Sequence, residues 1–213
     1  MGYSLRDLQA AGGAALTPDL LSPGSEDAHR EAVEEDRPIA AASRRRAWLF
    51  LAITAAVVIV ADVVTKTLAI QHLGNGQDSI RLLGGAVYLT FTRNAGAAFS
   101  IGEDLTWVFP IIAIIVCGVI VALARKLAST PWAIAIGLIL GGAMGNLADR
   151  IFRAPGPFRG HVVDFISVFG DAGERFPVFN VADSALTCGV VLAIILEFTG
   201  RRRDGLPATA DGS

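Results

Sequence analysis

Charged residues, cysteine and histidine are all scarce in this sequence. Only 18% of its 213 residues are charged, whereas a typical soluble domain has about 25%, so the composition argues against a water-soluble protein. Two cysteines and three histidines are too few for a disulfide framework or a His/Cys metal centre. The 18 basic and 20 acidic residues form no large basic patch, so we expect no nucleic-acid partner.

Apolar residues, by contrast, are abundant. They make up 53% of the chain and the mean hydropathy is +0.53, which excludes a disordered protein, because disorder requires low hydrophobicity. Four apolar stretches approach the ~20 helical residues that cross a bilayer core. They cover about 47–70, 105–124, 132–148 and 178–198. We therefore predict a membrane α-helical protein with four transmembrane helices.

Positive charge sets the expected orientation of these helices. Three basic clusters flank the apolar stretches, at 44–46, 125–126 and 201–203. With an even number of spans, all three clusters lie on one side of the membrane, which the positive-inside rule assigns to the cytosol. Both termini are then expected to be cytosolic, and segments 71–104 and 149–177 to face outward.

The two ends of the chain are polar. Residues 1–43 contain eight acidic residues and three arginines, and they do not have the basic-then-apolar pattern of a secretory signal peptide. We expect a mostly disordered cytosolic tail there, a four-span domain over 44–200 and a second cytosolic tail over 201–213.

The first outer segment contains a strand pattern. Val87, Leu89 and Phe91 alternate with Tyr88, Thr90 and Thr92, which is the period of two that a half-buried strand shows. Glycine- and asparagine-containing turns flank this stretch on both sides. We predict a small β-sheet on the outer membrane surface.

Ionisable and amide side chains gather near the predicted outer ends of the spans, a costly placement in a membrane that marks functional candidates. They are Asp62, Lys66, Asn146, Asp149, Arg150, Asp164, Asn180 and Asp183. Asp62 and Lys66 are four residues apart on one helix face, which favours a structural ion pair. Asp149 precedes Arg150, whose charge favours an ionised carboxylate, so a structural role is favoured there as well. The two asparagines fit structure and function equally.

Two of these residues, Asp164 and Asp183, have apolar neighbours and no adjacent cation in the sequence. Burial without a cation raises the pKa of a carboxyl group, and two close carboxylates resist double ionisation. If the two lie together, one shared proton supplies an acid and a base in one site, as in aspartic proteases. Sequence spacing alone does not establish that proximity.

Motifs for other chemistries are missing from the sequence. It contains no H-E-x-x-H zinc motif, no C-x-x-C and no phosphate-binding G-x-x-x-x-G-K-[ST]. The segment Ala98 to Gly102 lacks the first glycine of a G-x-S-x-G nucleophile elbow. We expect a site that uses no cofactor and no metal.

Five segments together resemble one known family, the bacterial lipoprotein signal peptidase or signal peptidase II, a membrane aspartic protease. They are D-V-V-T-K (62–66), T-R-N-A-G-A-A-F-S (92–100), G-G-A-M-G-N-L-A-D-R (141–150), V-V-D-F (162–165) and F-N-V-A-D-S (179–184). Each motif alone is modest, but all five occur in the order of the family. The resemblance covers roughly 47–200.

The resemblance implies that Asp164 and Asp183 are the catalytic pair, since they occupy the aspartate positions of the V-V-D-F and F-N-x-A-D motifs. It implies substrate-positioning or structural roles for the other polar motif residues, which are Asp62, Lys66, Asn94, Asn146, Asp149, Arg150 and Asn180. It also implies that the small extracytoplasmic β-sheet forms a cradle beside the active site.

The family's activity supplies the expected function. A member is a membrane aspartic endopeptidase that removes the signal peptide of a diacylglyceryl-modified prolipoprotein by cleaving before the lipidated cysteine. The resemblance thus implies prolipoprotein and membrane-lipid partners and a site in the bacterial cell membrane, near its outer face. We expect a monomer, because nothing in the sequence requires more.

Two other classes of function remain open from the residues alone. One is a small proton-linked transporter, although the middles of the second and third apolar stretches have no polar relay. The other is a non-catalytic membrane subunit that binds lipid or peptide. Two features depart from the family, namely the acidic tail and a longer connection over 151–160.

Overall fold

The computed structural model describes residues 23–74, 76, 78–96 and 107–205. The chain divides into two compact units, Met1–Ala42 and Ser43–Ser213, and the second contains every element discussed below apart from the first part of one helix. That helix begins at Pro23, and so it includes the second half of the segment for which we expected disorder.

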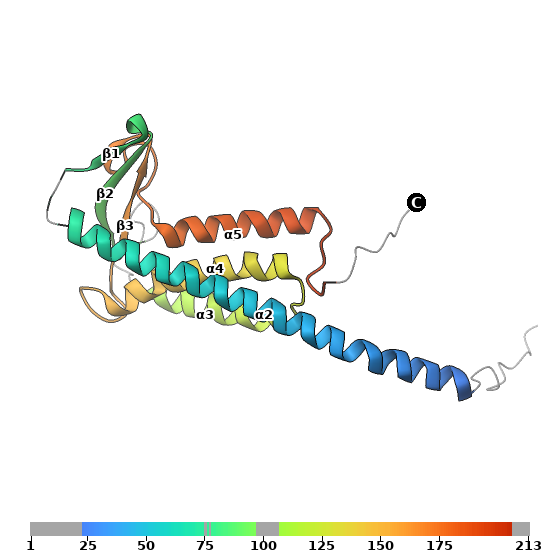
Figure 1. Ribbon diagram of the computed structural model, residues 1–213. Coiled ribbons are helices and arrows are strands. Elements are labelled where there is room, and N and C mark those ends of the chain that lie inside the picture. The colour runs from blue at the N-terminus through green and yellow to red at the C-terminus, as the bar shows by residue number, and fades with distance from the viewer. Residues whose placement is uncertain (1–22, 75, 77, 97–106, 206–213) are drawn as a thin grey trace, which may run out of the picture. The chain divides into compact units, whose positions relative to one another are not determined.

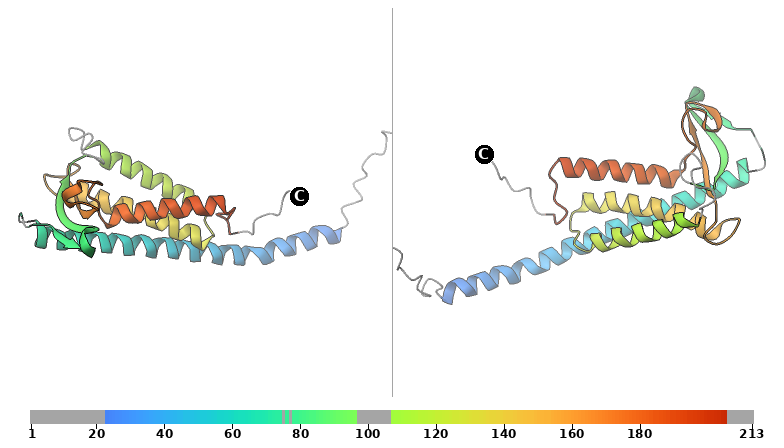
Figure 2. Two further views of the ribbon diagram at one scale, coloured as in Figure 1. Left: turned by 90° about the horizontal axis from the view of Figure 1, so that it is seen from above. Right: turned by 180° about the vertical axis from the view of Figure 1, so that it is seen from behind.

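Four helices make up most of the second unit, and they run side by side (Figures 1 and 2). They are α2 (Pro23–Leu73), α3 (Val108–Ala124), α4 (Thr130–Phe152) and α5 (Val181–Phe198). Among the described residues, three segments are long and apolar enough to cross a membrane, namely Ala41–Leu73, Thr130–Phe152 and Val181–Phe198. The remaining helix, α3, is apolar but has only 17 residues. The first residues of the predicted second span lie outside the described residues, so the count of four spans stays a prediction.

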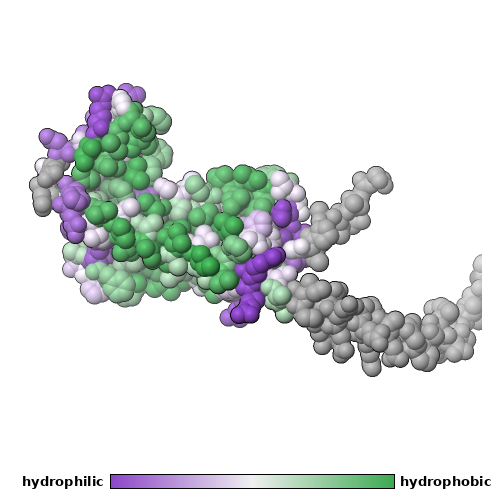
Figure 3. Space-filling view, viewed as in Figure 1, coloured by the Kyte–Doolittle hydropathy of each residue, from purple (hydrophilic) through white to green (hydrophobic). Residues whose placement is uncertain are grey.

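The surface of this helical unit is largely apolar. On the face drawn in Figure 3, hydrophobic residues cover most of the helices, while hydrophilic residues gather towards the two ends. Large apolar side chains such as Val57, Ile115 and Ile195 are more than half exposed. Since soluble proteins rarely expose contiguous apolar surfaces of this size, this pattern is that of a membrane protein.

A three-stranded antiparallel sheet lies at one end of the helices (Figure 1), which we call the sheet end. Its strands are β1 (Ile80–Leu82), β2 (Val87–Asn94) and β3 (Val162–Val168), in the order β1-β2-β3. The predicted strand is the central one, β2. The other two were not predicted, because β1 is very short and β3 is mostly apolar without a period of two, a pattern that does not distinguish strand from helix.

An irregularity in β2 decides which side chains face which side of the sheet. Leu89 pairs with Ile166 and Thr92 with Asp164, so β2 contains one extra residue between these pairs. Such a bulge reverses the alternation of side chains beyond it. Asn94 therefore shares the face of Asp164, while Arg93 shares the opposite face with its partner Val163.

Glycines allow α4 to approach both of its long neighbours closely. Gly137, Gly141 and Gly145 recur every four residues, and a Cβ atom at each would come within 2.8 Å of an atom of α2. A Cβ atom at Gly142 would come within 2.3 Å of the backbone of α5. In a bilayer no hydrophobic force drives helices together, so close packing of small residues is a main source of their association.

This packing predicts that Gly141→Ala destabilises the protein. The new Cβ would lie 2.8 Å from the Val58 side chain and 2.9 Å from the Ala55 carbonyl oxygen, and overpacking of this kind costs about 1–3 kcal/mol. Thermal unfolding in detergent measures the effect. Gly118→Ala on α3 is the matched control, because no atom lies within 4 Å of its new Cβ; equal melting temperatures for the two variants would contradict the packing account.

Candidate active site

The start of α5 fixes the position of Asp183. Asn180 is the residue that caps this helix, and its side-chain oxygen accepts a hydrogen bond of 2.9 Å from the Asp183 backbone N–H. In return, the Asp183 carboxylate accepts one of 3.2 Å from the Asn180 backbone N–H. This reciprocal arrangement is a capping box, which explains the three-residue spacing of the two polar side chains.

Asp164 reaches the same place from β3. The Asn180 side-chain amide donates a hydrogen bond of 2.6 Å to its carboxylate, and the Asn94 amide donates another of 3.2 Å from β2. Asp164 is only 3% exposed and Asn180 is fully buried. A single asparagine thus bonds both aspartates, so the structure brings together the two residues that the sequence singled out.

Asn146 of α4 links Asp183 to a buried cation. Its side-chain oxygen accepts a hydrogen bond of 3.0 Å from the Lys66 ammonium group and another of 3.1 Å from Asn180. Because these two donors fix its oxygen, its NH₂ group points the other way and donates to Asp183 over 2.7 Å. The orientation of this amide is therefore set by the charge of Lys66.

Lys66 itself is fully buried between two carboxylates. It forms ion pairs of 2.7 Å with Asp62 and 2.9 Å with Asp149, and the structure thus contains the Asp62–Lys66 pair expected from their spacing. Asp62 also accepts a hydrogen bond from the Ala182 backbone N–H of α5, and Asp149 accepts one from Val163 of β3. This group, which we call the Lys66 cluster, ties α2, α4, α5 and β3 together next to the two aspartates.

Arg150 does not form the ion pair with Asp149 that their adjacency in the sequence suggested. The ion pairs of Asp149 within the described residues are with Lys66 and Arg153. The Arg150 guanidinium instead donates to the backbone oxygens of Ala95 and Gly96, and it also lies over the Phe109 ring of α3. It therefore fixes the turn that follows Asn94, which holds Asn94 beside Asp164.

The electrostatics of Asp164 are unusual for a carboxyl group. Burial, and next the neighbouring Asp183 carboxylate, raise the pKa of Asp164 to about 7. The hydrogen bonds from Asn94 and Asn180 act in the opposite direction but do not cancel this effect. Near neutral pH the Asp164 carboxyl group can therefore either give or take a proton.

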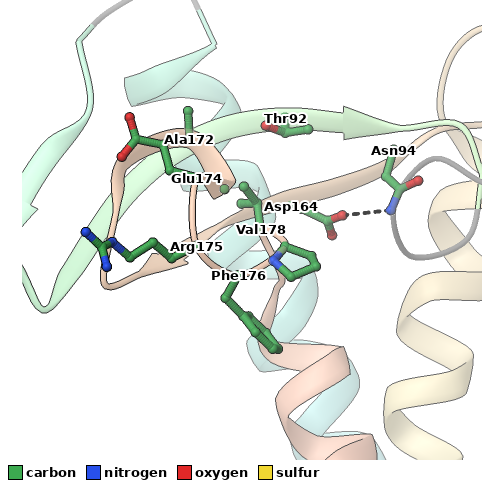
Figure 4. Close-up of a pocket in the computed structure, with 10 residues that line it drawn as sticks. Thr92, Asn94, Asp164, Ala172, Glu174, Arg175, Phe176 and Val178 are labelled. Atoms are coloured by element: carbon green, nitrogen blue, oxygen red, sulfur yellow. Dashed lines mark hydrogen bonds between the residues drawn. The ribbon is translucent and has the colours of Figure 1, made fainter.

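A cavity of about 320 Å³ opens beside Asp164 (Figure 4). Thr92, Asn94 and Asp164 line one side, and the segment 172–178 between β3 and α5 lines the other. Ser167, fully buried, holds this segment by donating to the Gly170 carbonyl and accepting from the Gly173 N–H. No sequence pattern marks Ser167, because a single serine in a mostly apolar strand carries no recognisable signal.

The site has the parts of an acid–base centre. It combines two hydrogen-bonded carboxyl groups, one of which has a pKa near neutrality, with a cavity that reaches one of them. Within the part of the chain that the structure describes, no three His, Cys, Asp or Glu side chains are grouped so that they could hold a metal ion.

Comparisons with known proteins agree with this arrangement. The family described as signal peptidase (SPase) II matches residues 54–199. A lipoprotein signal peptidase of Streptomyces coelicolor is 46% identical over 196 residues, which cover 89% of this chain and 93% of the relative. A lipoprotein signal peptidase of Mycobacterium tuberculosis is 48% identical over 170 residues, which cover 80% of this chain and 81% of the relative.

Solved structures agree as well. A bacterial membrane enzyme determined at 2.3 Å resolution is 36% identical, with a TM-score of 0.59, and the match covers 69% of this chain and 86% of the other. Another bacterial membrane enzyme, determined at 1.9 Å resolution, is 35% identical with a TM-score of 0.56, and the match covers 68% of this chain and 90% of the other. These matches confirm the resemblance seen in the five motifs: the chain belongs to the signal peptidase II family, and it is a protease of membranes.

Proposed function

We propose that this chain is an aspartic endopeptidase that removes signal peptides from diacylglyceryl-modified prolipoproteins, cleaving before the lipidated cysteine with Asp164 and Asp183 as its catalytic pair. The observation that carries the proposal is the joint hydrogen bonding of both carboxyl groups by Asn180, next to a cavity. The relatives' printed name, lipoprotein signal peptidase, supports the substrate class.

The contacts of the two aspartates suggest different roles for them. Asp183 accepts hydrogen bonds from Asn146 and from the backbone of Asn180, and it lies in the first turn of α5, where the helix dipole favours negative charge. These contacts stabilise a carboxylate, so Asp183 is the base. The pKa of Asp164, raised to about 7, makes that residue the acid.

Peptide hydrolysis then follows in two proton-balanced steps. Asp183 takes a proton from a water molecule, whose oxygen attacks the scissile carbonyl carbon, while Asp164 gives its proton to the carbonyl oxygen. A tetrahedral diol results. The carbon–nitrogen bond then breaks as Asp183 returns its proton to the leaving amine and Asp164 recovers one from the diol. Both carboxyl groups end in their starting states.

The position of the pair fits a substrate that is held in a membrane. With α3 as the second of four spans, the basic clusters at 44–46, 125–126 and 201–203 all lie on the same side of the membrane, which the positive-inside rule makes the cytosolic side. Both termini are then cytosolic, the sheet end faces outward, and the active site lies near the outer face of the bacterial cytoplasmic membrane. The diacylglyceryl chains lie among the helices and fix the peptide bond at the depth of Asp164 and Asp183, which is a positioning effect.

The remaining polar motif residues hold this pair and do not react. The Lys66 cluster and Asn146 fix Asp183, while Asn94, Asn180 and Arg150 fix Asp164 and the turn beside it. The domain boundaries expected from the sequence, with a four-span enzyme over 44–200, describe the working unit, and one chain supplies both aspartates, so a monomer suffices. A proton-linked transporter is not favoured, because the buried polar side chains of the described helices gather at the sheet end.

The proposal predicts that Asp164→Asn and Asp183→Asn each abolish cleavage, because neither variant retains both an acid and a base. A gel-shift assay with purified protein and a diacylglyceryl-modified prolipoprotein measures this. Asp78→Asn, which makes the same change at an exposed position near the sheet, is the control and should cleave as the parent does. Substrate without the lipid should remain uncut. Cleavage by either Asp164→Asn or Asp183→Asn at the parent rate would contradict the aspartic mechanism.

The raised pKa of Asp164 predicts the alkaline limb of the pH–rate profile. The acid keeps its proton below about pH 7 and loses it above, so kcat/KM should fall about tenfold per pH unit well above neutrality. Initial rates measured between about pH 5 and about pH 9 give this profile. A kcat/KM that stays constant up to the alkaline end would exclude Asp164 as the acid.

A further inference from the structure

A second cavity, of about 270 Å³, lies on the opposite face of the β2–β3 pair from the one that reaches Asp164. The bulge in β2 explains this division, because it turns Asn94 towards Asp164 and Arg93 towards the other side with Val163. The second cavity is lined by Arg93 and Val163 of the sheet, Ile70 of α2, and Phe152, Arg153 and His161 from the end of α4 and the connection after it. Arg153 and Val163 contact Asp149 of the Lys66 cluster, and the other residues that line this second cavity have no part in the catalytic proposal.

The polar groups of this cavity attract anions. Two guanidinium groups and one imidazole line it, and no carboxylate does so among the described residues. Arg93 is exposed, with its guanidinium 5.7 Å from the centre of the Phe91 ring. Arg153 forms an ion pair with the buried Asp149, which also pairs with Lys66. The Arg153 side chain is still 25% exposed. Arginine forks match the geometry of phosphate oxygens.

The apolar groups of the cavity indicate what kind of phosphate-containing molecule would bind there. Ile70 and Phe152 come from the last turns of α2 and α4, the two segments that end at the sheet end. Phe152 is 82% exposed, so most of its ring surface is accessible to an apolar ligand. At the end of a membrane span, an apolar ring beside a basic cavity lies at the depth where lipid phosphates meet acyl chains.

We infer that this cavity binds the phosphate of an anionic phospholipid headgroup of the outer leaflet, with Arg93, Arg153 and His161 around the phosphate and Phe152 against the acyl chains. The inference rests on the orientation given under the proposed function. Its consequence is that a lipid other than the substrate braces the back of the strand that carries Asp164, because Val163 lines the cavity and is its direct neighbour.

Native mass spectrometry of the full chain, released from detergent with added phosphatidylglycerol, tests this inference. The parent should retain one lipid molecule, and Arg93→Gln should bind it about fivefold more weakly, the effect of about one lost charge near a lipid surface. His161→Gln, which removes the imidazole from the cavity wall, should also bind the lipid more weakly than the parent. Arg159→Gln is the matched control, because Arg159 is exposed in the same connection but does not line the cavity. Thermal unfolding of each variant verifies that it is folded.

Two further arms identify the ligand. Diacylglycerol, which has no phosphate, should not be retained, and inorganic phosphate should compete only weakly. Equal retention of phosphatidylglycerol by the parent, Arg93→Gln and His161→Gln would overturn the inference, and tight binding of inorganic phosphate without the lipid would overturn the lipid assignment. Lipid binding is measured without substrate, so the two proposals are tested separately. A protein that cleaves its substrate but does not bind the lipid selectively contradicts this inference alone. A protein that binds the lipid but does not cleave contradicts the peptidase proposal alone.

Discussion

The mutual repulsion of two neighbouring carboxyl groups, of which Asp164 is buried, is the constraint on which the rest of the sheet end depends. Asp164 and Asp183 come from different elements, a strand and a helix start, and each would be more stable alone and in water. Asn180 offsets part of this cost, because its side chain donates to Asp164 and its backbone N–H donates to Asp183. Asn94 and Asn146 each supply a further donor. Under the proposed mechanism, Asp164 holds the one proton that the two groups carry between them.

The Lys66 cluster keeps these amides in place. Its fully buried ammonium group orients Asn146, while its two carboxylate partners accept backbone hydrogen bonds from α5 and from β3. A buried ion pair of this kind adds little stability by itself, since desolvation of the charges offsets their attraction. Its value here lies in geometry, because it connects α2, α4, α5 and β3 beside Asp164 and Asp183. The glycines of α4 make the connection possible, and a Cβ at Gly145 would come within 2.7 Å of the Asp62 carboxylate.

Much of this arrangement follows from the sequence. Apolar length predicts the helices, the alternation from Val87 to Thr92 predicts β2, and apolar flanks without a cation single out Asp164 and Asp183. The Asp62–Lys66 pair follows from its spacing. In each case the signal is local, since it lies within one continuous segment of the chain.

What the sequence did not predict depends on contacts between distant segments. The cation partners of Asp149 are Lys66 on another helix and Arg153, whereas its sequence neighbour Arg150 binds a turn more than fifty residues away. The bulge in β2 arises from its pairing with β3 and decides that Asn94, and not Arg93, faces Asp164. The second cavity follows from the same pairing, so no local pattern could have indicated it.

Infrared difference spectroscopy of the protonated carboxyl band tests most directly whether Asp164 and Asp183 form one coupled pair. We expect a band that is absent in Asp164→Asn and that titrates in the parent with a midpoint of about 7. In Asp183→Asn the midpoint should be lower, because the neighbouring negative charge that raises the pKa of Asp164 is gone. An identical midpoint in the parent and in Asp183→Asn would show that the two carboxyl groups titrate independently, and it would contradict the shared-proton mechanism.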